Sequence, residues 1–140
     1  MQPALLVLNF NTEGHLRQMA QAFPSFEVLY APDASQCEAV IAEHGARVQA
    51  VLTIGSIGLS AAQMLRMPAL TLVCALGAGY ENIDVAHAQA HGIAVGNGAG
   101  TNDDCVADHA MGLLIASMRG LVRLDRATRD GVWRTALALP

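Results

Sequence analysis

The chain has 140 residues and a net charge of −4, and 53% of its residues are hydrophobic while only 14% are charged. It is long enough for one domain with a core, but no apolar run approaches the roughly 20 residues that a bilayer span needs. The absence of lysine excludes P-loop phosphate binding, Schiff-base chemistry and receiver-domain chemistry, and the acidic balance argues against a nucleic-acid partner.

Strand-like apolar runs alternate with helix-like segments along the first two thirds of the chain. The predicted strands are Ala4–Asn9, Phe26–Ala31, Gln49–Thr53, Leu70–Ala75 and Ile93–Val95, and the predicted helices between them are Glu13–Phe23, Ser35–His44, Ser60–Met67 and Val85–His91. Because the first strand starts almost at once, we expect no secretory leader. Alternation of this kind is typical of a parallel sheet covered on both faces. Right-handed crossovers then predict a five-stranded, doubly wound, flavodoxin-like α/β fold.

The fourth strand leads into a glycine turn, Gly77-Ala78-Gly79, and a helix follows. Strand, glycine turn and helix bring bare backbone N–H groups together, which favours an anion site. Gly77 and Gly79 match the first half of the dinucleotide motif G-x-G-x-x-G, but Asn82 stands at the third glycine position. That motif also usually opens its domain, whereas several elements precede this turn. A smaller anion such as a carboxylate fits the turn better, and ligands of parallel sheets bind at this strand edge.

The segment 96–104 contains three glycines with Asn and Asp, and it is the strongest break in the chain. We expect Asp103 or Asp104 to cap a long helix from about Cys105 to Arg129. The middle of this helix is apolar almost all the way around, so it must be buried on more than one side. The predicted division is a flavodoxin-like domain, 1–98, and a hinge with a long helix, 99–140, that packs on another domain or subunit.

The cysteines are odd in number and far apart, without C-x-x-C spacing, at Cys37, Cys74 and Cys105. This pattern predicts reduced, partly buried thiols in a cytoplasmic protein.

Two groups of helical side chains allow more than one interpretation. Helical i, i+3, i+7 spacing places Asp84, His87 and His91 on one side of a helix, where they could bind a metal or form its solvent-exposed face. We assign no metal site. One helical face is predicted to carry Arg119, Arg123 and Arg126, as a solvated surface or a docking surface for an acidic neighbour. His109 could be an acid or base, or a packed histidine.

Three segments, in order and at matching distances, carry a family resemblance. Residues 73–84, V-C-A-L-G-A-G-Y-E-N-I-D, resemble the G-x-G-[YF]-D-N-[IV]-D segment of D-isomer-specific 2-hydroxyacid dehydrogenases. Residues 92–95 and then 100–110 resemble that family's G-I-x-V block and the N-x-x-S-V-A-E-H that opens its long helix. Residues 131–133 resemble the G-x-W that follows. The chain is most similar to the glyoxylate/hydroxypyruvate or hydroxyphenylpyruvate reductase branch.

The resemblance implies a role for five residues. Backbone amides of the Gly77, Ala78 and Gly79 turn would hold the carboxylate of a 2-oxo acid, and Ile54 would shape the substrate pocket. Val106 would approach the nicotinamide of NAD or NADP. Mild departures are Glu for Asp at 81, Cys for Ser at 105 and Asp for Glu at 108.

The resemblance also implies an NAD(P)-dependent oxidoreductase that interconverts 2-oxo acids and D-2-hydroxy acids, and a homodimer through the Cys105–Arg129 helix. The family's Rossmann domain, with its dinucleotide loop, catalytic Arg and Glu–His pair, has no counterpart in these 140 residues. We therefore assign no catalytic residue and expect a truncated form or proteolytic remnant that is inactive alone. The alternative is a stand-alone small-ligand-binding or sensory flavodoxin-like module.

Overall fold

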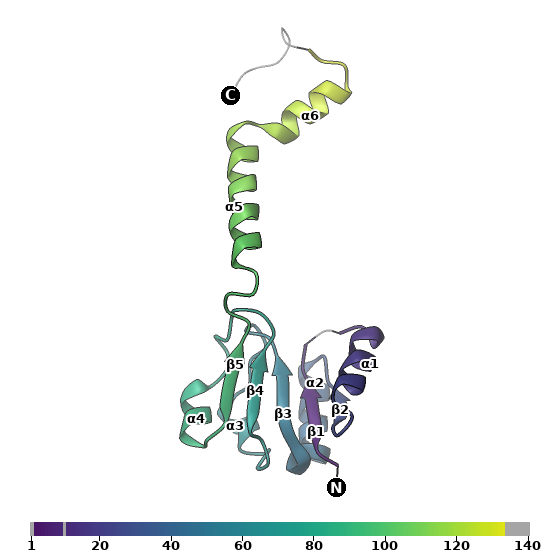
Figure 1. Cartoon of the computed structure of the whole chain (residues 1–140), viewed down its shortest axis with the longest axis vertical. Helices are drawn as coiled ribbons and strands as arrows, with labels where there is room; N and C mark the ends of the chain where they lie inside the picture. Colours follow the sequence, from purple (N-terminus) through teal and green to yellow (C-terminus); the bar gives the residue numbers. More distant parts are fainter. Residues whose placement is uncertain (1, 10, 134–140) are drawn as a thin grey trace. The chain divides into compact units, whose positions relative to one another are not determined.

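The computed structural model describes residues 2–9 and 11–133. The chain divides into two compact units, Met1–Thr101 and Asn102–Pro140, which are described separately. The first unit holds a five-stranded sheet with the order β2-β1-β3-β4-β5, in which every neighbouring pair is parallel (Figure 1). The strands are β1 Ala4–Val7, β2 Glu27–Tyr30, β3 Val48–Thr53, β4 Leu72–Ala75 and β5 Ala94–Asn97. The predicted five-stranded, doubly wound fold is confirmed.

One side chain from each strand forms a continuous apolar row across the sheet. In sheet order the row is Leu29, Leu6, Val51, Val73 and Val95, each paired in register with the next. The row belongs to the main hydrophobic core, together with side chains from α2 Ala34–His44, α3 Ala61–Met64 and α4 Val85–Ala90. These three helices therefore cover one face of the sheet.

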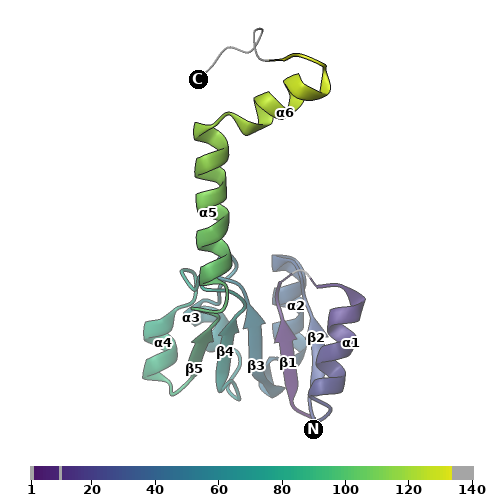
Figure 2. The same cartoon turned by 45° about the horizontal axis from the view of Figure 1, so that its top comes forward.

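The opposite face is covered less completely. Side chains of a strand alternate between faces, so Leu5, Leu52 and Leu72 point away from the core row. Together with α1 Glu13–Ala22 they line an apolar hollow of about 250 Å³. In Figures 1 and 2 helix α1 lies near β1 and β2, and Leu72 on β4 remains 38% exposed. Helices lie on both faces, as predicted, but among the described helices of the first unit only α1 covers this face.

Side-chain caps define where the helices of the first unit begin. The N-cap oxygens that accept a hydrogen bond from the third helical N–H belong to Thr12, Asp33, Ser60 and Asp84. The Ser60 cap is a complete capping box with Gln63. Helix α3 ends at Met64, before the predicted Met67, and the chain leaves it through tighter turns in which the N–H groups of Arg66 and Met67 donate to the carbonyls of Gln63 and Met64.

The second unit corrects the prediction of one long helix. Two helices, α5 Asp103–Met118 and α6 Leu121–Arg129, are bent by 61° from each other. Gly120 separates them in the left-handed conformation, with φ +58°, which glycine adopts without steric cost. The predicted caps are also wrong, since Asn102 is the N-cap of α5 and both acidic residues lie in the first turn. Carboxylates there are favoured by the helix dipole.

Neither α5 nor α6 contains a buried residue. No single helix of the described residues reaches the length and hydropathy of a membrane span, although α5 and α6 meet those limits when taken together across their bend.

Candidate functional site

The candidate site lies at the carboxyl edge of the sheet, where the loops after β3, β4 and β5 meet. The N–H of Leu76, directly after β4, donates to the carbonyl of Thr53 at the end of β3, with an N···O distance of 2.8 Å. On the other side, the N–H of Gly98 donates to the carbonyl of Gly77 at 2.7 Å. The glycine turn is thus held by loops on both sides of it.

Hydrogen bonds from the β5 side orient the peptide groups of this turn. Gly98 binds the Gly77 carbonyl, and the side-chain amide of Asn97 donates to the Ala78 carbonyl at 2.7 Å. No peptide bond of the described residues is cis. In a planar trans peptide the C=O and the following N–H point in opposite directions. The N–H groups of Ala78 and Gly79 therefore point away from the β5 loop.

These N–H groups are available to a ligand. Within residues 2–9 and 11–133, no atom accepts a hydrogen bond from the N–H of Gly77, Ala78 or Gly79. Ala78 is exposed and Gly79 is half-buried. Gly77 has φ +100°, a conformation that favours glycine. Successive unpaired N–H groups form a concave anion site, and a carboxylate suits its size.

The loop after β3 lies directly against this turn. The hydroxyl of Thr53, which is fully buried, donates to the carbonyl of Gly58 at 2.9 Å and closes the loop. An ideal Cβ built on Gly55 would lie 2.6 Å from the carbonyl carbon of Gly79, so only glycine allows this approach. The contact brings Ile54, half-buried and adjacent in sequence, close to the amide row.

Asn82 ties the two loops together. Its side-chain amide donates to the carbonyl of Ser56 at 3.0 Å, and its own carbonyl accepts from the N–H of Leu59 at 3.0 Å. A parallel bridge between Leu59 and Ile83 continues the connection. The sequence identified Asn82 only as a missing third glycine; the interloop bonds give it a structural role that pattern reasoning missed.

Asn97 and Glu81 also belong to this region and were not predicted as site residues. Asn97 lay in a segment interpreted as a flexible connection, and an Asn two residues after the apolar run Ile93–Val95 was the available signal. The Glu81 carboxylate oxygens lie 2.7 and 2.8 Å from an ideal Cβ built on Gly79. They fill space that a side chain at 55 or 79 would need.

The other candidate residues are used structurally or lie elsewhere. The carboxylate of Asp84 accepts from the His87 N–H at 2.9 Å, and the rings of His87 and His91 stack with centroids 4.0 Å apart. No group of three metal-binding side chains occurs among the described residues. Val106 and His109 are exposed on α5, in the second unit.

The cysteines differ from one another. Cys37 is buried, which raises the pKa of its thiol, and Cys74 is half-buried. Cys105 is exposed, so the expectation of a partly buried thiol is wrong for this residue. An exposed thiol follows from its place on α5, which buries no residue.

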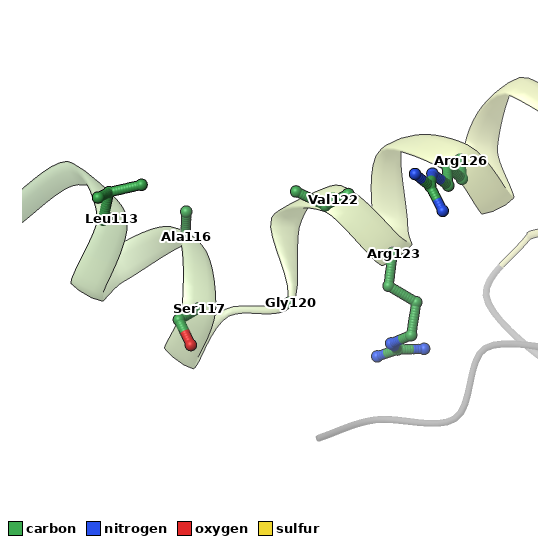
Figure 3. A pocket seen from close by; sticks show the side chains of 7 residues that line it. All are labelled: Leu113, Ala116, Ser117, Gly120, Val122, Arg123 and Arg126. Atoms are coloured by element: carbon green, nitrogen blue, oxygen red, sulfur yellow. The ribbon is translucent and has the colours of Figure 1, made fainter.

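Contrary to the prediction, Arg119 does not share one helical face with Arg123 and Arg126, because the break at Gly120 separates it from α6. At this elbow a hollow of about 560 Å³ is lined by residues from both helices (Figure 3). Arg123 and Arg126 flank it on α6, while Leu113 and Ser117 line it on α5.

Comparison with known proteins gives one consistent result. The model of the family described as D-isomer specific 2-hydroxyacid dehydrogenase, catalytic domain, matches residues 7–138. A glyoxylate reductase of Korarchaeum cryptofilum is 31% identical over 136 residues, which is 97% of this chain and 40% of that protein. The chain thus spans about 40% of the length of this relative.

Solved structures agree in fold. A 2-hydroxyacid dehydrogenase from Ketogulonicigenium vulgare Y25 matches with a TM-score of 0.81 at 28% identity, over 100% of this chain and 43% of that one. An NADPH-dependent glyoxylate/hydroxypyruvate reductase from Sinorhizobium meliloti, in complex with NADP and malonate, matches with a TM-score of 0.74 at 28% identity. That match covers 99% of this chain and 42% of the other.

Proposed function

The chain belongs to the D-isomer specific 2-hydroxyacid dehydrogenase family, and from that premise we propose that it is the substrate-binding part of an NAD(P)-dependent oxidoreductase. The reaction interconverts 2-oxo acids and D-2-hydroxy acids. The observation that carries the proposal is the row of unpaired N–H groups at Gly77, Ala78 and Gly79. Their bond dipoles hold a substrate carboxylate without a cationic side chain, and Asn97 keeps them oriented toward it.

The substrate we propose is a small, hydroxypyruvate- or glyoxylate-like acid. Relatives named glyoxylate reductase and the malonate complex of the Sinorhizobium enzyme support this size. Locally, Ile54 is adjacent in sequence to the close approach at Gly55, and its side chain is uncharged.

Residues in this chain do not provide a dinucleotide pyrophosphate loop. No complete G-x-G-x-x-G occurs in the sequence, and the Asn82 side chain at the third position donates a hydrogen bond to the Ser56 carbonyl.

NAD(P)H, when bound in the full family enzyme, supplies the hydride, and we propose that Val106 contacts it. The residues here bind and orient the acid, and we propose that the 140-residue chain alone has no turnover. Its free thiols support the expected cytoplasmic setting.

A titration followed by two-dimensional ¹⁵N–¹H NMR tests the carboxylate site. Adding hydroxypyruvate or glyoxylate to the 140-residue chain should shift the amide signals of Ala78 and Gly79 most. Asn97→Ala should weaken binding about 2- to 10-fold, the range expected for one hydrogen bond. Asn102→Ala is the matched control, because that side chain makes no cap hydrogen bond. Unchanged signals at Ala78 and Gly79 with saturating acid would reject the proposal.

Inactivity is tested separately. Steady NAD(P)H oxidation by the purified chain with either acid would show that the proposed inactivity is wrong.

We also propose a homodimer through the segment Cys105–Arg129, which forms α5 and α6, since eight large apolar side chains there are exposed. They are Val106, Met111, Leu113, Leu114, Ile115, Met118, Leu121 and Val122.

A further inference from the structure

Asn9, two residues after β1, carries a buried side-chain amide that the fold does not use. The residue is only 5% exposed, and its Oδ1 atom accepts no hydrogen bond within residues 2–9 and 11–133. Its Nδ2 group finds no acceptor in the same residues. Buried side-chain amides are nearly always hydrogen-bonded, so an unpaired one needs an explanation. A ligand that is absent here is one such explanation.

The backbone at Asn9 is held in place by other groups. The side-chain amide of Asn11, which is also buried, donates to the Asn9 carbonyl at 3.0 Å. The hydroxyl of Tyr30, at the end of β2, accepts from the Asn11 N–H at 3.1 Å and donates to the Asn11 carbonyl at 3.3 Å. These bonds fix the segment after β1 without involving the Asn9 amide. The amide is therefore positioned but left unpaired.

Asn9 lies where strands β1 and β3 separate. The N–H of Leu8 donates to the Leu52 carbonyl at 2.9 Å. A parallel ladder that continued would next pair the Ile54 N–H with the Leu8 carbonyl. That bond is absent from the described part of the chain, and the register ends at Val7 and Leu52. From β1 the chain passes to β2 on one side and then to β3 on the other, which makes this a topological switch point (Figure 1). Ligands of open α/β sheets bind in the crevice at such a point.

The distance from Asn9 to the glycine turn suits a small acid. Continued beyond the strands, the register places Asn9 beside Ile54 and Ile54 beside Leu76, which precedes Gly77. By the alternation of strand side chains, Asn9 and Ile54 point to the same face of the sheet. Two strand spacings, about 10 Å in all, separate Asn9 from the turn. A three-carbon acid with a hydrogen bond of about 3 Å at each end spans about this length.

We infer that Asn9 is a specificity-determining residue that selects 2-oxo acids with a hydroxyl group on the third carbon, as in hydroxypyruvate. The inference rests on the proposed function, in which the amides of Ala78 and Gly79 hold the carboxylate. A side-chain amide offers an acceptor oxygen and N–H donors, and a hydroxyl group can bind to either end of it. The methyl group of pyruvate can bind to neither, and glyoxylate has no third carbon. A site that hydrogen-bonds a substrate hydroxyl discriminates against analogues that lack it.

Hydroxypyruvate and pyruvate differ only by this hydroxyl group, so they are the matched probes. In ¹⁵N–¹H NMR titrations of the 140-residue chain, both acids should shift the amide signals of Ala78 and Gly79. Hydroxypyruvate should bind about 2- to 10-fold more tightly, the range expected for one hydrogen bond. The side-chain amide signals of Asn9 should move with hydroxypyruvate and stay in place with pyruvate. Equal affinities for the two acids would overturn the inference.

The substitution Asn9→Leu removes the amide while nearly keeping the volume of the side chain. The variant should bind both acids as weakly as the wild type binds pyruvate. Asn97→Ala is the contrasting variant: it should weaken both acids by the same factor, because Asn97 orients the turn that holds the carboxylate. A preference for hydroxypyruvate that persists in Asn9→Leu would overturn the role of Asn9 and leave the carboxylate site intact.

Urea unfolding separates this role from a structural one. Because the substitution removes a buried unpaired group, Asn9→Leu should be at least as stable as the wild type. A clearly less stable variant would mean that the fold uses the amide, and this result would overturn the inference. If neither acid shifts the signals of Ala78 and Gly79 in the wild type, the proposed function is rejected together with it.

Discussion

Replacing Gly55 by alanine tests how the candidate site is assembled. The new Cβ would lie 2.6 Å from the carbonyl carbon and 2.7 Å from the carbonyl oxygen of Gly79, and it would also strike the Glu81 carboxylate. The Glu81 tip can rotate away, but Gly79 is backbone and must shift together with the loop that Asn82 holds. Overpacking of this kind costs about 1–3 kcal/mol.

The size of the effect can be compared with a matched substitution. For a domain of this size, 1 kcal/mol corresponds to about 4–8 °C in Tm, so Gly55→Ala should lower the Tm by about 10 °C. Gly14→Ala makes the same chemical change in α1, where the nearest atom to the new Cβ is 3.7 Å away. That control should stabilise the protein by up to about 1 kcal/mol. Urea unfolding measures both; a Gly55→Ala variant within 0.5 kcal/mol of wild type would refute the overpacking argument.

Three further predictions concern other parts of the chain. The hydrogen bond from Arg47 at 2.7 Å holds the pKa of Glu27 below its ordinary value of 4.5. The ion pair therefore stabilises the fold at neutral pH, and this stabilisation is lost as the pH falls through the lowered pKa. Arg47→Met should return the Glu27 pKa toward 4.5 in a carboxyl-carbon NMR titration, and an unchanged titration would contradict the assigned cause. With a thiol reagent at pH 8, exposed Cys105 should react first and Cys37 only on unfolding, because burial raises the pKa of Cys37 and excludes the reagent; equal rates would argue against its burial. Gly120→Ala should destabilise the elbow by about 1–2 kcal/mol, since a left-handed conformation is unfavourable with a Cβ, and a gain in helical circular dichroism would instead mean that α5 and α6 have joined.

The sheet was predictable because its strands are short apolar runs and the central ones, β1, β3 and β4, hold buried residues. Each strand is a short run of apolar residues between polar or glycine-rich segments, and such runs occupy the centre of a parallel sheet whatever surrounds them. The ends were less accurate. The fifth strand was predicted at Ile93–Val95 but lies at Ala94–Asn97. The N–H of Ile93 bonds to Ala88 and closes α4, while Asn97 pairs in register with Ala75.

The break at Gly120 could not be predicted from the helical pattern. A single glycine in a helix costs only about 1 kcal/mol relative to alanine, so a continuous apolar helix around it remained plausible. The glycine turn itself was predicted from Gly77 and Gly79. The groups that orient it were not, because Asn97 and Gly98 reach it only after β4 and β5 have become neighbours.

The bonds that Asn82 makes between the loops have a consequence for redesigning this domain. Residues 54–58 and 77–83 are far apart in sequence, yet Asn82, Ser56 and the Leu59–Ile83 bridge join them into one rigid part. An insertion or exchange in either loop alone would remove hydrogen bonds from the other. Selection for a new ligand should therefore randomise or graft both loops together. Substitutions in one loop and in the other should have non-additive effects on stability and binding.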